Sequence, residues 1–186
     1  VVYADALKIT VKRENSYAKA AVHIIYGIRD ENKRGLLDLS TNPTESSTRR
    51  SERIAKLQQR RIKAVDLFVA DGLPYLEDEI HKYFPVTAFQ KCVVHKMRNI
   101  LNKVRAKHKK EISEDLKQVF DNFDKDSNIE DAQNKLKAFI KKWEKTYKDM
   151  AQFFDDNTLE YYFTYIQFPC KLRRMIYTTN SIEALN

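Results

Sequence analysis

Three carboxylates far apart in the sequence are the residues best suited to chemistry. Asp5 shares the parity of the apolar residues in an alternating run, and Asp71 directly follows the apolar run 65–70. Glu183 is the third residue of a helix that Asn180 is expected to open. A charged acid on a buried face costs free energy unless it is paired, hydrogen-bonded or bound to a metal. In a basic chain, three such acids predict a divalent-metal site that acts on phosphodiesters.

Each acid also has a structural explanation. Asp5 fits the end of a strand where the face turns toward solvent. Asp71-Gly72 is an ordinary turn signal, and Asp is a good helix N-cap. Glu183 completes a capping box with Asn180. Sequence spacing alone leaves both explanations open for each residue.

Cys92 and His95 form a Cys-x-x-His pair. Zinc would need about two further ligands, for which the candidates are His81, His108 and Cys170. Because no second paired motif accompanies it, we favour a polar pair that supports the metal site or DNA. Two cysteines make no disulfide framework and fit a reducing compartment.

The positive charge is concentrated in one segment. The chain carries a net charge of +8, and residues 91–110 hold eight basic side chains and no acid. A second basic stretch, 49–63, has seven basic residues and one acid. Such patches attract phosphate backbones, although a solvated lysine-rich helix face gives the same pattern. The predicted DNA contacts are Lys91, Lys96, Arg98, Lys103, Arg105 and Lys107.

Hydrophobic periodicity gives the elements that position these residues. Alternation and short apolar runs predict strands over 1–13, 18–28, 35–39, 65–70 and 85–89. Helical spacing predicts a helix from Asn42 to about 62, a second over 73–83, and helices from 93 onward. Ser127 is expected to cap one of these in a capping box with Glu130. Trp143 is expected in the core of that helix, with base stacking as the alternative.

The order of these elements predicts an α/β fold. Three consecutive strands followed by alternating helix and strand are typical of a ribonuclease H-like mixed sheet flanked by helices. We expect a core over 1–92, a mainly helical insertion over 93–176, and the start of a final core helix over 177–186. The chain has only 3 Gly and 4 Pro, which argues against a turn-rich all-β fold, and it has no apolar run long enough for a membrane span.

Four motifs together carry a family resemblance. The chain resembles the mutator-family bacterial insertion-sequence transposases in Val69-Ala70-Asp71-Gly72-Leu73, in the run from Phe84 to Asn99, in the run from Tyr177 to Asn186, and in the strand from Tyr3 to Arg13. The motifs occur in the family's order over essentially the whole chain.

That resemblance implies a DDE transposase catalytic domain, with Asp5, Asp71 and Glu183 as its three acids and Cys92 and His95 as its Cys-x-x-His pair. We expect two Mg²⁺ ions, with Mn²⁺ as substitute, bridged by Asp5 and held further by Asp71 and by Glu183. The expected partners are double-stranded DNA at transposon ends and targets, and further copies of the chain when active. The expected location is the bacterial cytoplasm, at the nucleoid when DNA is bound, with no membrane association.

Two other functions remain open at this stage. A ribonuclease H-like nuclease would hydrolyse DNA without strand transfer. An inactive DNA-binding or dimerisation remnant of a transposase would bind DNA without cutting it. The chain begins without Met and stops three residues after Glu183, so we expect it to be a fragment of a longer protein.

Overall fold

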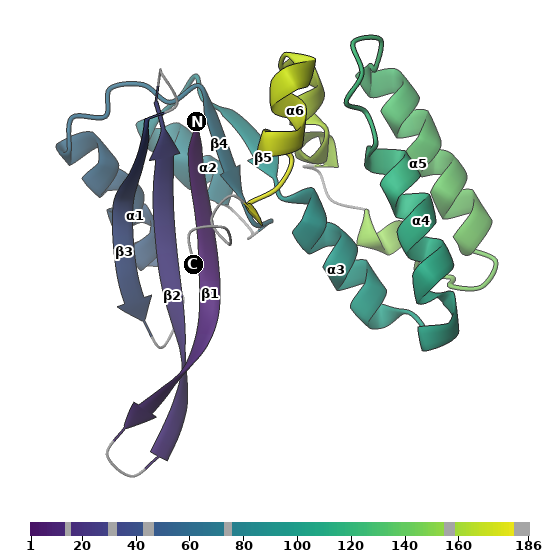
Figure 1. Cartoon of the computed structure of the whole chain (residues 1–186), viewed down its shortest axis with the longest axis horizontal. Coiled ribbons are helices and arrows are strands. Elements are labelled where there is room, and N and C mark those ends of the chain that lie inside the picture. The colour runs from purple at the N-terminus through teal and green to yellow at the C-terminus, as the bar shows by residue number, and fades with distance from the viewer. Residues whose placement is uncertain (14–15, 30–32, 43–46, 73–75, 155–158, 181–186) are drawn as a thin grey trace. The chain divides into compact units, whose positions relative to one another are not determined.

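The computed structural model describes residues 1–13, 16–29, 33–42, 47–72, 76–154 and 159–180. The chain divides into two compact units. We call Val1–Phe89 with Thr179 and Asn180 the sheet unit, and Gln90–Thr178 the helical unit. Figure 1 shows the strands and helices of each.

The sheet is mixed and has five strands in the order β3-β2-β1-β4-β5. The strands are β1 (Val2–Arg13), β2 (Ser16–Ile28), β3 (Arg34–Asn42), β4 (Leu67–Ala70) and β5 (Ala88–Lys91). The first three form an antiparallel meander, and β4 pairs with β1 in parallel. The predicted mixed α/β architecture is therefore confirmed, with all five strands near their expected positions.

Two helices of the sheet unit, α1 (Ser47–Gln59) and α2 (Leu76–Tyr83), lie on one side of the sheet, behind it in Figure 1. Apolar side chains of both helices are buried, namely Ile54, Leu57, Leu76 and Ile80. A hydrogen bond from Arg53 Nε to Asp38 Oδ2 at 2.9 Å joins α1 to β3.

The predicted start of the first helix at Asn42 is wrong. Asn42 is the last residue of β3, where it pairs with Ala21, and the helix begins at Ser47. The Pro43 and Glu45 of the expected cap lie outside the described residues. Strand pairing with β2 outweighs the local capping signal at Asn42, because the ladder satisfies backbone groups over the whole strand.

The predicted buried face of β1 holds only near its beginning. Tyr3 is fully buried, whereas Ile9 and Val11 are 40% and 37% exposed. β3 pairs with β2 only from Ala21 onward, so residues 9–13 of β1 and 16–20 of β2 pair only with each other among the described strands. We call these two segments the ribbon; Figure 1 shows it extending beyond the other strands of the sheet unit.

The helical unit contains four α-helices within its described part and several short 3₁₀ turns. The elements are α3 (Val93–Lys103), η2 (Ala106–His108), α4 (Lys109–Phe120), α5 (Ile129–Trp143), η3 (Ala151–Phe153), η4 (Leu159–Tyr162), η5 (Thr164–Gln167) and α6 (Cys170–Ile176). Helices α4 and α5 pack side by side (Figure 1). None of the helices described is long and apolar enough to cross a membrane.

The N-cap of α5 is shifted by one residue from its predicted position. Asn128, not Ser127, is the N-cap; its Oδ1 accepts from Asp131 N at 2.9 Å, and its Nδ2 donates to Asp131 Oδ2 at 2.7 Å. The first bond is that of an N-cap, whereas the second joins the two side chains instead of the Asn128 main-chain N–H that a capping box uses.

The core of the helical unit is strongly aromatic. Trp143 is buried as predicted, and its Nε1 donates to Asp115 Oδ2 at 2.7 Å. Tyr165 is fully buried in the aromatic stretch after α5, and its hydroxyl donates to Phe120 O at 2.8 Å. Buried tyrosine and tryptophan are stabilised when their polar ends find such partners.

Candidate active site

Asp5 and Asp71 lie next to each other at the centre of the sheet. The parallel register of β1 and β4 pairs Val2 with Phe68, Tyr3 with Val69 and Ala4 with Ala70. Asp5 is the next residue of β1, and Asp71 is the residue that directly follows β4. Neighbouring strands lie about 4.8 Å apart, so the structure brings together two acids separated by 65 intervening residues.

The sequence places each acid there for a local reason. All four residues of β4, Leu67–Ala70, are buried, and the strand ends immediately before Asp71. Asp5 is 9% exposed and lies opposite Ile24 of β2. Ligand sites of α/β sheets gather where buried strands end, which is the position that Asp71 occupies.

Main-chain hydrogen bonds hold one oxygen of each carboxylate. Asp5 Oδ1 accepts from Ala6 N at 2.8 Å, and Asp71 Oδ1 accepts from Gly72 N at 2.7 Å. These bonds orient the two carboxylates. An ion held by two carboxylates with substrate phosphate and water is the arrangement that Mg²⁺ prefers, so the pair fits a divalent-metal site.

The third predicted acid, Glu183, lies outside the described residues, as does most of the helix that Asn180 was expected to open. Across the described ranges, no group of three or more His, Cys, Asp or Glu side chains is placed to hold a metal ion. The register places Asp5 and Asp71 near each other, and the roles of Asp5, Asp71 and Glu183 as metal ligands stay predictions.

Cys92 is the N-cap of α3, and His95 lies in its first turn. Cys92 is buried, and its Sγ lies 3.6 Å from Thr178 Oγ1. Val93 N donates to Tyr177 O at 2.9 Å, which joins the start of α3 to the same segment. His81, the one zinc candidate in the sheet unit, has its Nε2 3.0 Å from Thr87 O. The described residues thus give the zinc alternative no support, and Cys92 and Val93 contact the segment that leads toward Glu183 in sequence.

The basic segment divides into exposed and packed side chains. Arg98, Lys103, Arg105 and Lys107 are exposed on α3 and the following turn, and Lys96 is half-buried. Lys96 Nζ lies 4.9 Å from the Tyr162 ring centre and 5.4 Å from that of Phe154. Lys103 Nζ lies 5.0 Å from the Phe153 ring centre. These cation–π contacts pin the lysine stems to the aromatic 3₁₀ turns and leave the guanidinium groups on the surface.

Lys91 departs from the surface position that the sequence led us to expect. It lies on β5, it is only 5% exposed, and its Nζ lies 5.5 Å from the Tyr162 ring centre. A side chain this buried does not present its charge to a phosphate backbone. Lys91 therefore leaves the set of proposed DNA contacts.

Sequence inspection overlooked Gln90, which is fully buried. Its Oε1 accepts from Tyr165 N at 2.7 Å, and its Nε2 donates to Lys91 O at 2.7 Å and to Tyr162 O at 3.3 Å. Gln90 thus ties β5 to the aromatic turns. No local sequence signal marked it, because the partners of this buried amide include Tyr162 and Tyr165, more than seventy residues away.

Comparison with known proteins identifies the family. A model of the family described as "Transposase, Mutator family" matches residues 1–186. This chain belongs to the Mutator family of transposases. The match covers every residue of the chain, including those outside the described ranges.

Individual relatives of this Mutator-family chain agree. It is 31% identical over 185 residues to the transposase for insertion sequence element IS1201 of Lactobacillus helveticus, covering 100% of this chain and 48% of the relative. It is 31% identical over 188 residues to the transposase for IS905 of Lactococcus lactis subsp. lactis (strain IL1403), covering 100% of this chain and 46% of the relative. The chain thus spans about half the length of these relatives.

Proposed function

We propose that this chain is the catalytic domain of a DDE transposase, which cuts DNA strands at transposon ends and joins them to target DNA. The observation that carries the proposal is the register of β1 and β4, which sets Asp5 beside Asp71. The sheet order β3-β2-β1-β4-β5, with an antiparallel meander followed by a parallel strand, supports a ribonuclease H-like core. The curated relatives are named as transposases of insertion sequences.

Asp5, Asp71 and Glu183 would hold the divalent ions, Mg²⁺ with Mn²⁺ as substitute. When bound, such ions supply charge neutralisation at phosphorus and lower the pKa of water. The hydrogen bonds from Ala6 N to Asp5 and from Gly72 N to Asp71 support a site whose carboxylates are oriented before substrate arrives. Water hydrolyses the strand at the element's end, and the freed 3′-hydroxyl then attacks a target phosphodiester in the same site.

The exposed cations of the helical unit would hold the DNA. Arg98, Lys103, Arg105 and Lys107 are exposed, and Lys96 is half-buried. Such contacts give affinity and register rather than sequence readout. The active form is proposed to be a homo-oligomer, since two transposon ends must be processed together.

The test is Asp71→Asn in the full-length protein that contains this chain. We expect strand cleavage in Mg²⁺ or Mn²⁺ to fall by at least about 10³-fold, because the change removes a carboxylate at the reacting centre. DNA affinity should stay within about twofold, because the phosphate contacts lie elsewhere. Asp66→Asn, an exposed acid just before β4, is the matched control and should cleave normally.

Three outcomes separate the alternatives. Retained cleavage by Asp71→Asn would refute the assignment of Asp71 to the active site. Cleavage by the unaltered protein without joined products would indicate a nuclease that lacks strand transfer. DNA binding that needs no metal, with no cleavage under any condition, would indicate a binding remnant.

A further inference from the structure

The ribbon formed by residues 9–13 and 16–20 has two chemically different faces. Residues directly opposite in an antiparallel pair share a face, and successive residues alternate. The register pairs Thr10 with Lys19 and Lys12 with Tyr17, which places these four on one face. Ile9 and Val11 belong to the other.

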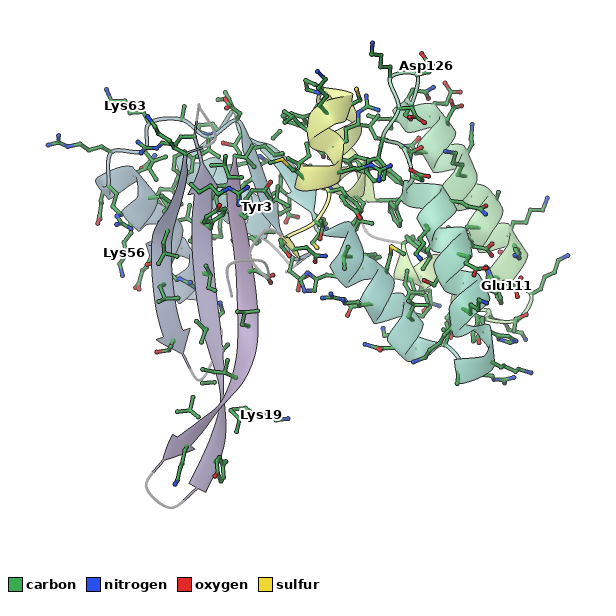
Figure 2. All side chains as sticks on the ribbon, viewed as in Figure 1. Tyr3, Lys19, Lys56, Lys63, Glu111 and Asp126 are labelled. Carbon is green, nitrogen blue, oxygen red and sulfur yellow. The ribbon has the colours of Figure 1, made fainter. Side chains whose placement is uncertain are left out.

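The face with the two lysines is open to solvent. Thr10, Lys12 and Lys19 are exposed, and Tyr17 is 74% exposed, the most of any described aromatic residue for which an exposure is given. Figure 2 shows Lys19 on the ribbon, pointing away from the strands. An exposed aromatic ring beside cations can stack on the bases of a nucleic acid while the cations bind its phosphates.

Charge and shape favour a nucleic acid as that partner. Residues 8–20 contain four basic side chains and one acid, so the segment repels a second basic chain and attracts phosphates. The major groove of duplex DNA is about 12 Å wide and admits a two-stranded β-ribbon. From Asp5 to Lys12, β1 runs seven residues, or about 23 Å, so one duplex of about seven base pairs could reach both.

We propose that the ribbon is a second DNA-contacting element, in which Lys12 and Lys19 bind phosphates while Tyr17 packs against the sugar–base surface of a groove. The inference rests on the proposed function only in taking duplex DNA as the substrate. It concerns the sheet unit alone and does not depend on the basic segment of the helical unit.

The first measurement is fluorescence anisotropy with a labelled random-sequence duplex between about 50 and 200 mM salt. Lys12→Gln/Lys19→Gln should flatten the slope of log affinity against log salt by roughly 1.8, which is a loss of roughly 60-fold at about 0.1 M salt. The control is Lys137→Gln/Lys141→Gln, two exposed lysines of α5 with the same loss of charge. Its slope should match that of the unaltered chain.

The second measurement replaces Tyr17 with photoreactive benzoylphenylalanine. We expect a covalent adduct with the duplex that disappears at high salt. Equal slopes for the two lysine pairs, or adducts only with a second copy of the chain, would overturn the proposal. All altered side chains are exposed, so circular dichroism and the melting temperature should be unchanged.

The ribbon and the carboxylate pair can fail separately. Cleavage by Asp71→Asn would refute the proposed active site but would not change the salt slopes expected for the ribbon variants. If the Lys12→Gln/Lys19→Gln variant kept the salt slope of the unaltered chain while cleavage still required Asp71, only the proposed DNA contact of the ribbon would be overturned.

Discussion

Removing one charge from the carboxylate pair is expected to stabilise the metal-free chain. Asp5 lies in β1 and Asp71 directly follows the neighbouring strand β4, and two such strands lie about 5 Å apart. Two like charges at this distance repel by about 0.8 kcal/mol at the dielectric constant of water and about 3 kcal/mol at the lower value typical near a protein surface. Because Asp71 is half-exposed, we expect Asp71→Asn to gain about 1 kcal/mol. Asparagine keeps the oxygen that accepts from Gly72 N, so the change removes charge and little else.

Mn²⁺ should reverse the order of the Tm values of the unaltered chain and Asp71→Asn. If the pair binds Mn²⁺, then a concentration ten times the Kd adds about 1.4 kcal/mol to the unaltered chain. For a chain of this size, 1 kcal/mol corresponds to about 2–4 °C in Tm, so the expected rise is about 3–6 °C. Asp71→Asn should gain about 2–4 °C without metal and show almost no further rise with it.

Differential scanning calorimetry in EDTA and in Mn²⁺ measures both effects on the same samples. Asp66→Asn is again the control; its side chain is exposed, and only its main-chain oxygen is used, accepting from Ala88 N. A lower Tm for Asp71→Asn in EDTA would contradict the expected repulsion between the Asp5 and Asp71 carboxylates. A Mn²⁺ shift as large as that of the unaltered chain would show that Asp71 is not a metal ligand.

Two further predictions concern the helical unit. Asn128→Ala should cost about 1 kcal/mol in a urea titration, because it removes the cap on Asp131 N, whereas Ser127→Ala should be nearly neutral; the reverse order would restore Ser127 as the cap. Tyr165→Phe should cost about 0.5–1.5 kcal/mol, because it removes the hydroxyl that donates to Phe120 O and accepts from Asn122 Nδ2, while Asn122 N still donates to Phe120 O. Burial raises the pKa of Tyr165, so the unaltered chain should lose stability as pH rises above about 10. The urea midpoint of Tyr165→Phe should fall less over the same pH range.

Some of the fold follows from local sequence. The run 65–70 is apolar throughout, and its centre forms the fully buried β4. Apolar residues at helical spacing likewise predict the buried side of α5, where Leu136, Phe139 and Trp143 are buried. These elements can be predicted from sequence because a fully buried strand requires a continuous apolar run and a buried helix face requires apolar residues at helical spacing.

Other features needed contacts that sequence patterns do not record. Alternation predicted a buried face along all of β1, but Ile9 and Val11 are exposed because the pairing of β3 with β2 begins only at Ala21. Lys91 belongs to a run of cations, but the ring of Tyr162, distant in sequence, packs against it. A lysine's neighbours in the chain do not say which ring will cover it.

The sequence by itself determined the elements, the basic segments and the choice of Asp5 and Asp71 as candidate acids. Motif order also pointed to the family to which the chain belongs. Only the tertiary structure decided that the two acids are neighbours, because parallel pairing depends on contacts between segments more than sixty residues apart. It alone decided that residues 9–13 and 16–20 stand as a two-stranded ribbon, because the exposure of a strand depends on where its neighbours stop.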